Sequence, residues 1–279
     1  MTIAISLKVN DGVVLASDSA STLIDQSGLV RNVYNNANKI FNLRKGLPVG
    51  AITWGSGSIG SAAISTLAKD LRRRFAGEDP QHDAWRINPT AYSIQWVAAK
   101  LREFMFDEFY SPAFAQEPQK PLLGFVVAGY SSGNGMAEEY EIRIANGQCG
   151  PPTLARPIDE CGIVWDGQPE AIARLLRGFS YGLARVLEHD LGVPAAQVAQ
   201  ALDVIQEKLG TPLIEPAMPI QDAIDLAEFL VDVTIRYARF MPGADTVGGP
   251  IEVAAITKHE GFKWVRRKHY FTADLNPEA

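Results

Sequence analysis

The grouping of the predicted strands into hairpins is the feature that most constrains how this chain can fold. Residues 2–8 alternate small or polar side chains with large apolar ones, and Asn10-Asp11-Gly12 marks a tight turn before a second apolar run at 13–17. Further strand pairs are predicted at 38–43 with 49–54, 122–128 with 138–144, and 251–257 with 262–266. Hairpins of this kind exclude the strict strand–helix alternation of a doubly wound parallel sheet.

The predicted helices also come in groups. Apolar residues return at three- and four-residue spacing between residues 58 and 75, and a second helix is predicted over 89–109. Two or three more helices are expected within 169–240. Two stacked antiparallel sheets covered by helices fit this order. Because no internal repeat or long Pro/Gly linker divides the chain, a single domain over 1–279 is predicted.

Charge and cysteine content argue against several functional classes. The formal net charge is -6 and the pI is near 5.3, so nucleic acid is not an expected partner. No apolar stretch approaches the roughly 20 residues of a membrane span, so a membrane is not an expected partner either. Two cysteines and the lack of a signal-peptide pattern indicate a cytoplasmic location. The histidines lack metal-ligand spacing, so no metal or cofactor is expected. The short basic runs at 72–74 and 266–268 are interpreted as a helix end and a strand edge.

A glycine-rich segment, Gly55-Ser56-Gly57-Ser58-Ile59-Gly60, follows a predicted strand and opens a helix, as a dinucleotide fingerprint would. Such a fingerprint also needs a second parallel strand that ends in Asp or Glu about 20 residues later. Here the predicted helix runs instead into Gly77-Glu78-Asp79-Pro80. A close strand-to-helix turn is therefore the preferred interpretation, and nucleotide binding is a weaker alternative.

Three polar residues stand at the ends of the first predicted strands. Thr2 begins the first strand directly behind Met1, and its small side chain favours removal of Met1. Asp18 ends the second strand, within Ala16-Ser17-Asp18-Ser19. Lys39 opens the third, within Asn38-Lys39-Ile40-Phe41. Each residue alone has an ordinary structural explanation, and only their shared order and setting point to a functional site.

In that order and setting the chain resembles the catalytic β-subunits of proteasomes and their bacterial relatives, the ATP-dependent heat-shock peptidase and the Anbu-type peptidases. In that family a threonine starts the subunit, a hairpin leads to an Ala-x-Asp-Ser-like segment, and a lysine opens the next strand. The spacing from Thr2 to Asp18 matches the family, whereas Asp18 to Lys39 is five positions longer, so a longer hairpin is expected between them. The resemblance continues through 122–129 and 244–249 and covers most of the chain.

The resemblance implies a fold and an assembly. The fold is α+β, a four-layer αββα sandwich of two antiparallel sheets flanked by helices, called the N-terminal nucleophile (Ntn) hydrolase fold. Helical or loop insertions are expected near 78–120 and 190–225. Because family members are homo-oligomers, a ring or spiral of many copies is expected, with the helices at 58–75 and 89–109 supplying apolar surface between subunits. The existence of an ATPase partner stays open.

The resemblance also implies an activity. The chain would be a threonine-type peptidase or amidase, an endopeptidase that cleaves peptides or unfolded proteins through an acyl ester on Thr2. A threonine hydroxyl needs a base, and a freed α-amino group with a pKa of about 7.7–8.0 supplies one on the same residue. A nearby Lys39 ammonium would lower that pKa, and Asp18 would hold the lysine charged and oriented.

The site residues that the resemblance implies fall into two groups. The expected catalytic residues are Thr2, Asp18, Lys39, Asp166 and Asp245. The residues expected to bind an extended substrate or line its side-chain pocket are Ser21, Thr22, Ala37, Gly50, Trp54 and Gly55. An oxyanion donor is expected from a backbone N–H within 51–55, at Gly55 or Ile52.

The sequence departs from the family at two catalytic positions. Asp166 stands where the family has a serine in a Gly-Ser-Gly turn, and Gly248 or Val247 stands where a second serine accompanies the last aspartate. Three functions are therefore weighed: an active threonine hydrolase, an inactive scaffold that only assembles, and a nucleotide-binding protein that uses Gly55–Gly60.

Overall fold

Two large antiparallel sheets form the centre of the protein, in a computed structural model that describes residues 2–24 and 29–268. The first sheet has the strand order β13 (Gly162–Gly167), β1 (Ile3–Val9), β2 (Gly12–Ser17), β14 (Glu252–Thr257) and β15 (Gly261–Arg266). The second has the order β11 (Gln148–Cys149), β10 (Glu138–Ala145), β9 (Leu123–Gly129), β6 (Val49–Gly55) and β5 (Ile40–Asn42), and β12 (Thr153–Leu154) also pairs with β10. Two small hairpins join β3 (Ser21–Ile24) to β4 (Val30–Tyr34) and β7 (Ser58–Ile59) to β8 (Ala62–Ala63).

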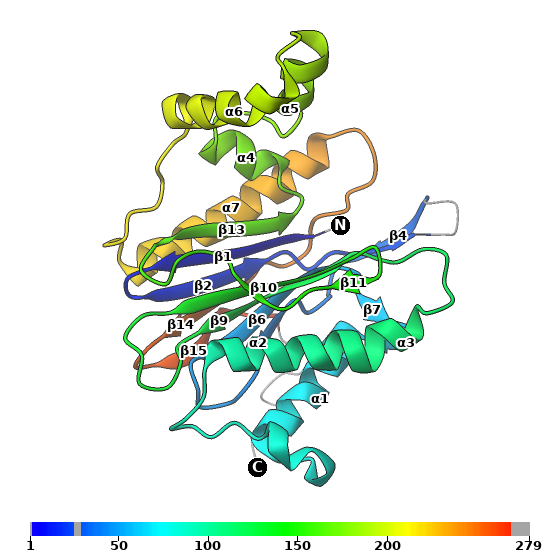
Figure 1. The fold of residues 1–279 in the computed structure, drawn as a ribbon, viewed down its shortest axis with the longest axis vertical. Coiled ribbons are helices and arrows are strands. Elements are labelled where there is room, and N and C mark those ends of the chain that lie inside the picture. Colours follow the sequence, from blue (N-terminus) through cyan, green and yellow to red (C-terminus); the bar gives the residue numbers. More distant parts are fainter. Residues whose placement is uncertain (1, 25–28, 269–279) are drawn as a thin grey trace.

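The helices lie on either side of the strands, as Figure 1 shows. They are α1 (Ile64–Ala76), α2 (Ile94–Arg102), α3 (Ser111–Ala113), α4 (Glu170–Leu176), α5 (Leu183–Arg185), α6 (Ala195–Leu209) and α7 (Ile220–Phe240). A 3-10 helix spans Pro80–Trp85, and π-helical segments span Glu103–Tyr110 and Val186–Asp190. Within residues 2–24 and 29–268, none of the helices combines the length and the apolar character that crossing a membrane requires.

All four predicted strand pairs are present, which confirms the antiparallel organisation. The first hairpin closes where the turn was expected, with Lys8 paired to Val13 and Val9 to Gly12. The pairs β5–β6, β9–β10 and β14–β15 occupy the predicted ranges to within a few residues. These pairings confirm that the alternating pattern of the sequence encodes hairpins rather than crossover units.

The two sheets pack against each other through an apolar cluster to which both contribute. Ala4 and Leu15 of the first sheet meet Ile52 and Val126 of the second. The neighbouring residues Ile3, Ile5 and Leu7 point the other way because successive side chains of a strand alternate between its two faces.

Helices cover the outer faces of both sheets. On the first sheet, α7 buries Ala223, Ala227 and Val231 against Ile5 and Leu7. On the second, α1 and α2 bury an apolar face composed of Ile64, Leu67, Leu71, Phe75, Ile94, Val97 and Leu101. The expectation that these two helices offer their apolar faces to other subunits is therefore wrong, because those faces already form part of the chain's own core.

Two predicted helical regions differ in detail from the structure. Helix α1 begins at Ile64 rather than near residue 58, because 58–63 form the β7–β8 hairpin and the Gly57 carbonyl accepts a hydrogen bond from the Ile64 N–H. The range 169–240 holds four α-helices, α4 to α7, rather than two or three. In Figure 1, α5 and α6 project beyond the sheets, and α6 carries much of the expected insertion at 190–225.

The expected long hairpin between Asp18 and Lys39 is formed by β3 and β4. Ser21 pairs with Tyr34, and Thr22 pairs with Val33. The tip of this connection, residues 25–28, lies outside the described residues, as does Met1. The hairpin accommodates the additional positions and lets Asp18 and Lys39 approach each other at its base.

Candidate active site

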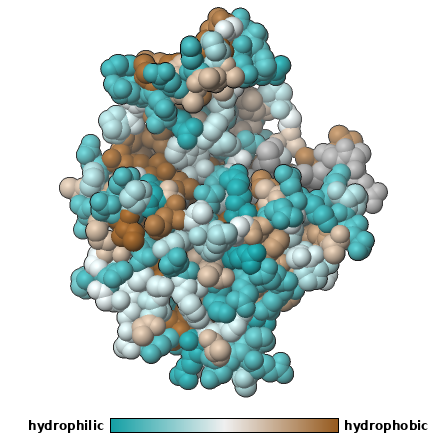
Figure 2. Space-filling model, in the orientation of Figure 1, coloured by the Kyte–Doolittle hydropathy of each residue, from teal (hydrophilic) through white to brown (hydrophobic). Residues whose placement is uncertain are grey.

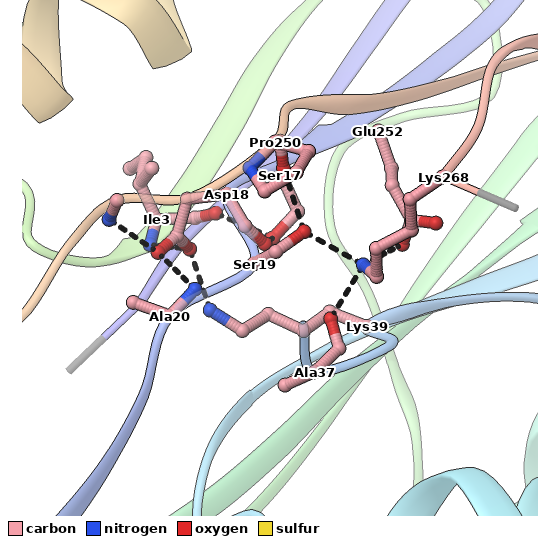
Figure 3. A network of polar contacts seen from close by, with 11 residues as sticks. Ile3, Ser17, Asp18, Ser19, Ala20, Ala37, Lys39, Pro250, Glu252 and Lys268 are labelled. Carbon is pink, nitrogen blue, oxygen red and sulfur yellow. Dashed lines mark hydrogen bonds and ion pairs between the residues drawn. The ribbon is translucent and has the colours of Figure 1, made fainter. Parts of the chain in front are cut away.

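Asp18 is the centre of a buried polar network at the end of β2 (Figure 3). Its carboxylate is fully buried. Oδ1 accepts hydrogen bonds from the Ile3 N–H at 3.0 Å and from Lys39 Nζ at 2.6 Å. Oδ2 accepts from the N–H groups of Ala20 and Gly248, both at 3.0 Å. Backbone and side-chain donors therefore fix the carboxylate and stabilise its charge inside the protein.

Lys39 is the counter-ion of Asp18. It directly precedes β5, and its side chain is only 7% exposed. Burial lowers the pKa of Lys39 from its usual value, and the charge and hydrogen bond of Asp18 oppose that change. The structure thus brings together two of the predicted site residues in the pairing that the sequence predicted.

Thr2 lies next to this pair, at the start of the chain that the structure describes. It is 4% exposed and immediately precedes Ile3, whose N–H binds Asp18. The Thr2 carbonyl accepts a hydrogen bond from the Gln168 N–H at 2.7 Å. Gly167 permits this approach because a Cβ there would lie 1.9 Å from the Thr2 carbonyl oxygen. Met1, whose removal was predicted, lies outside the described residues.

The loop before β14 contacts Asp18 through a residue that was not expected. Asp245, the predicted catalytic residue of this loop, is exposed, whereas Gly248 donates its N–H to Asp18. The Gly248 carbonyl also accepts from the Ser19 N–H at 2.9 Å. A glycine has no side chain to offer, so the contact of this loop with the Asp18 carboxylate is made by its backbone.

Asp166 is placed on the inner face of the first sheet. It pairs with Ala4 in the β1–β13 register, and paired residues point to the same face. Its carboxylate lies 3.4 Å from the Arg143 guanidinium of the second sheet. Burial is the main cause that raises the pKa of Asp166 to about 6, and Glu141 raises it further. A carboxyl group with this pKa can hold or release a proton near neutral pH.

Several residues expected to bind substrate lie around the base of the β3–β4 hairpin. Ser21 lies beside the glycine-rich turn, since a Cβ on Gly57 would be 3.3 Å from the Ser21 hydroxyl. Ala37 donates its N–H to the Ser19 carbonyl at 2.9 Å. Thr22 follows in β3, and Gly55 ends β6 in a left-handed conformation with φ of 91°. The substrate-binding role of each of these residues stays a prediction.

Gly50 and Trp54 occupy the packed interior instead. A Cβ on Gly50 would lie 2.8 Å from the Phe262 ring, in the half of the sheets that is remote from Asp18. Trp54 is 3% exposed and belongs to the cluster between the sheets, where its indole rests on Gly124. The structure does not bring these two residues to a pocket beside Thr2, because β6 is a central strand whose residues fill the core.

The glycine-rich segment lacks the surroundings of a dinucleotide site. Its strand, β6, lies between β5 and β9, and it is antiparallel to both. A dinucleotide fingerprint requires a parallel βαβ unit, and the described strands around β6 do not form one. Close packing explains why position 55 is a glycine, since a Cβ there would lie 2.3 Å from the Leu122 carbonyl oxygen.

Lys268 is the site residue that sequence reasoning missed. It belongs to the basic run at 266–268 that was interpreted as a solvated strand edge, yet its side chain is only 7% exposed. It forms an ion pair with Glu252 at 2.9 Å and donates hydrogen bonds to Ser19 and Ala37. A lysine after a strand is normally exposed, so nothing in the local pattern indicated its burial.

Among residues 2–24 and 29–268, no group of His, Cys, Asp and Glu is arranged to hold a metal ion.

Comparison with known proteins supports the fold at a coarse level. No protein-family model and no curated protein matches the sequence. Among solved structures, the chain is similar to Anbu (ancestral beta-subunit) from Yersinia bercovieri, with a TM-score of 0.54 and 13% identity over 96% of this chain and 88% of that chain. An Anbu (Gly-1) mutant from Hyphomicrobium sp. strain MC1 has a TM-score of 0.49 and 17% identity over 96% of this chain and 86% of that chain. The first of these likenesses indicates a proteasome-like fold.

Proposed function

We propose that this protein is a threonine-type amide hydrolase of the proteasome-like group, with Thr2 as its nucleophile after removal of Met1. The observation that carries the proposal is the buried Asp18–Lys39 pair, whose carboxylate also binds the N–H of Ile3. A buried ion pair adds little net stability compared with apolar packing, so its place beside Thr2 favours a chemical role.

The chemistry follows from the neighbours of Thr2. The Thr2 hydroxyl attacks the carbonyl carbon of an amide, and its proton passes to the freed α-amine of the same residue. The amine then delivers a proton to the leaving nitrogen as the C–N bond breaks, which leaves an ester on Thr2. Water attacks that ester, with the amine again accepting the proton, and releases the acid.

Lys39 and Asp18 tune that base. A positive charge close to the α-amine favours its neutral form, which is the form that accepts a proton. Asp18 fixes the direction of the Lys39 side chain through the 2.6 Å contact. We assign to Asp166, whose pKa is raised to about 6, the proton-exchanging role of the family's serine.

The finer assignments belong to the same proposal. The two sheets and their covering helices are assigned to the four-layer αββα sandwich of the Ntn hydrolases, and the substrate to peptides or unfolded proteins. An extended substrate would add as a strand beside Ser21 and Thr22, opposite the turn that holds Gly55 and Gly57. The closeness of Ser21 to the glycine-rich turn supports this location, since a Cβ on Gly57 would lie 3.3 Å from the Ser21 hydroxyl.

A mass measurement tests the nucleophile. The purified protein is expected to lack Met1 and to gain one equivalent of a β-lactone probe, mapped to the peptide that begins with Thr2. Thr2→Ala should lose the adduct, and Thr2→Ser should keep part of it because a hydroxyl and an amine remain. Thr257→Ala, at the far end of β14, is the matched control and should label like the parent. Retention of Met1, or an adduct that persists in Thr2→Ala, would refute the mechanism.

The role of Lys39 needs a paired design. Lys39→Met alone leaves the fully buried Asp18 without its counter-ion, which costs about 3–5 kcal/mol of stability. Lys39→Met combined with Asp18→Asn removes both charges and should restore much of that stability while labelling of Thr2 stays lost. Labelling of the double variant at the parental rate would remove Lys39 from the mechanism.

A scaffold without activity is the second candidate function, and one observation favours it. Asp245 is exposed, and Gly248, which lacks a side chain, makes the contact of its loop with Asp18. A protein that assembles, has a free Thr2 amine and yet forms no adduct would support the scaffold over the hydrolase.

A further inference from the structure

Lys268 joins three segments that meet around Asp18 (Figure 3). Its Nζ donates to the Ser19 hydroxyl at 2.6 Å and to the Ala37 carbonyl at 2.8 Å. Its third contact is the ion pair with Glu252 of β14. A lysine ammonium has three N–H donors, so these three partners account for all of them.

The two hydrogen-bond partners of Lys268 adjoin the proposed catalytic pair. Ser19 follows Asp18 in the chain, and Ala37 lies two positions before Lys39. The Ser19 hydroxyl also donates to the Pro250 carbonyl at 2.6 Å. The Lys268 ammonium therefore holds the segment after β2 and the segment before β5 at once, from a position 249 residues away from Ser19.

Stability alone is a poor explanation for this arrangement. The side chains of Lys268 and Glu252 are only 7% and 2% exposed. Bringing both charges out of water costs free energy that their attraction barely offsets, and an apolar pair of similar volume would stabilise the fold at least as well. The buried ion pair is better explained if it fixes the positions of the chain segments that Lys268 contacts, those of Ser19 and Ala37.

We propose that Lys268 is a positioning residue for the Asp18–Lys39 pair, with Glu252 as its counter-ion. Its ammonium fixes the two segments that carry Asp18 and Lys39 and so sets the distance and direction between those side chains. This inference rests on the proposed function for its catalytic consequence, but the positioning itself is a property of the fold.

The charge of Lys268 also acts on the site. The groups that face Lys39 are Asp18 at the end of β2, Glu252 on β14 and Lys268 after β15. Burial lowers the pKa of Lys39 most, Asp18 raises it, and Lys268 lowers it further. Loss of Lys268 would therefore raise the pKa of Lys39 and, by the same electrostatic effect, that of the Thr2 amine.

The test compares three variants of the full-length protein. Lys268→Met removes the ammonium and leaves the buried Glu252 carboxylate unpaired. Lys268→Met combined with Glu252→Gln removes both charges, so no buried charge is left without a partner and the variant can fold. Lys263→Met removes an exposed lysine from the same β14–β15 hairpin and is the matched control. Hydrogen exchange read by mass spectrometry reports on the amides of 17–22 and 36–41, and the β-lactone labelling rate of Thr2 is followed from pH 5 to pH 9.

In the charge-neutral double variant, exchange in both segments is expected to rise at least tenfold while β9 and β10 exchange as in the parent. Labelling should slow at least tenfold. In Lys268→Met, the acid limb of the labelling rate should move to higher pH, because a neutral Thr2 amine then needs a higher pH. Lys263→Met should change neither quantity.

Parental exchange in 17–22 and 36–41 of the double variant would overturn the proposal, and so would an equal rise throughout the chain. If the parental protein forms no adduct at Thr2, the proposed function fails, but the exchange measurement still decides whether Lys268 positions the Asp18–Lys39 pair. Faster local exchange with unchanged labelling would overturn the catalytic consequence and leave a purely structural clamp.

Discussion

At the scale of single residues, the site is built from charged groups whose burial is compensated by specific partners. Asp18 has four donors, and Lys268 has three acceptors. A buried carboxylate or ammonium without such partners would become neutral or destabilise the fold. The charge of Asp166 is less well compensated, because its ion pair with Arg143 is longer, at 3.4 Å.

The raised pKa of Asp166 gives a prediction for stability against pH. Its folded-state pKa of about 6 exceeds the ordinary value of 3.8, so the folded state binds more protons between these values. The stability that this group contributes is therefore fully present below pH 3.8 and is lost as the pH rises through about 6. Asp166→Asn should gain stability relative to the parent between pH 4 and pH 8, by on the order of 1 kcal/mol after allowance for solvent screening.

Urea unfolding at pH 4, pH 6 and pH 8 measures this difference for Asp166→Asn. An unfolding free energy that differs from the parental one by the same amount at all three pH values would show that the carboxyl of Asp166 titrates normally.

At the scale of elements, the end of β13 determines where the start of β1 lies. Gly167 closes β13 with φ of 100°, and Ile3 is its partner in the register. The Gln168 N–H continues this pairing to the Thr2 carbonyl. Thr2 is thus held in line with β1, although it precedes the strand itself.

Gly167→Ala should displace Thr2. The new Cβ would lie 1.9 Å from the Thr2 carbonyl oxygen, and alanine disfavours positive φ. We expect a loss of more than about 2 kcal/mol in the free energy of unfolding, together with loss of Thr2 labelling. Gly133→Ala is the control, since Gly133 also has positive φ, at 80°, but a Cβ there meets nothing within 4 Å. Equal destabilisation of the two variants in urea would show that backbone strain, and not the contact with Thr2, is the cause.

At the scale of the whole molecule, the apolar faces of α1 and α2 are already buried, so any assembly must use other surfaces. Apolar side chains gather on the face shown in Figure 2. Ile163, Trp165 and Leu226 are only partly buried against the core that α7 covers. Phe240 at the end of α7 is 83% exposed, and the next residue, Met241, is 50% exposed. Exposed apolar surface of this kind is typical of protein–protein contacts.

The resemblance to proteasome β-subunits implies a homo-oligomer of many copies, in a ring or spiral, and we propose that this exposed apolar surface contributes to it. Sedimentation velocity at micromolar concentration should show one large species, and Phe240→Asp should weaken it while the chain stays folded, because Phe240 makes little contact within the protein. Only monomer in the parental sample would contradict the expected assembly.

The sequence by itself determined the elements that depend on neighbouring residues. Strand alternation and the turn at Asn10 and Asp11 specified the first hairpin, and three- to four-residue spacing specified most of α1. The order and setting of Thr2, Asp18 and Lys39 resemble those in proteasome β-subunits, and that resemblance allowed a site to be predicted. Local periodicity encodes burial well for such elements.

Only the tertiary structure decided which distant residues complete the site. Lys268 has the sequence signature of a surface lysine, and Gly248 has that of a loop glycine, yet both contact groups about 230 to 250 residues away in the chain. Trp54 and Gly50 were expected at a pocket but fill the core, because their strand is covered on both faces. Periodicity reports that a residue is buried, but the partner of a buried polar group is set by how the two sheets stack, and no local pattern records that.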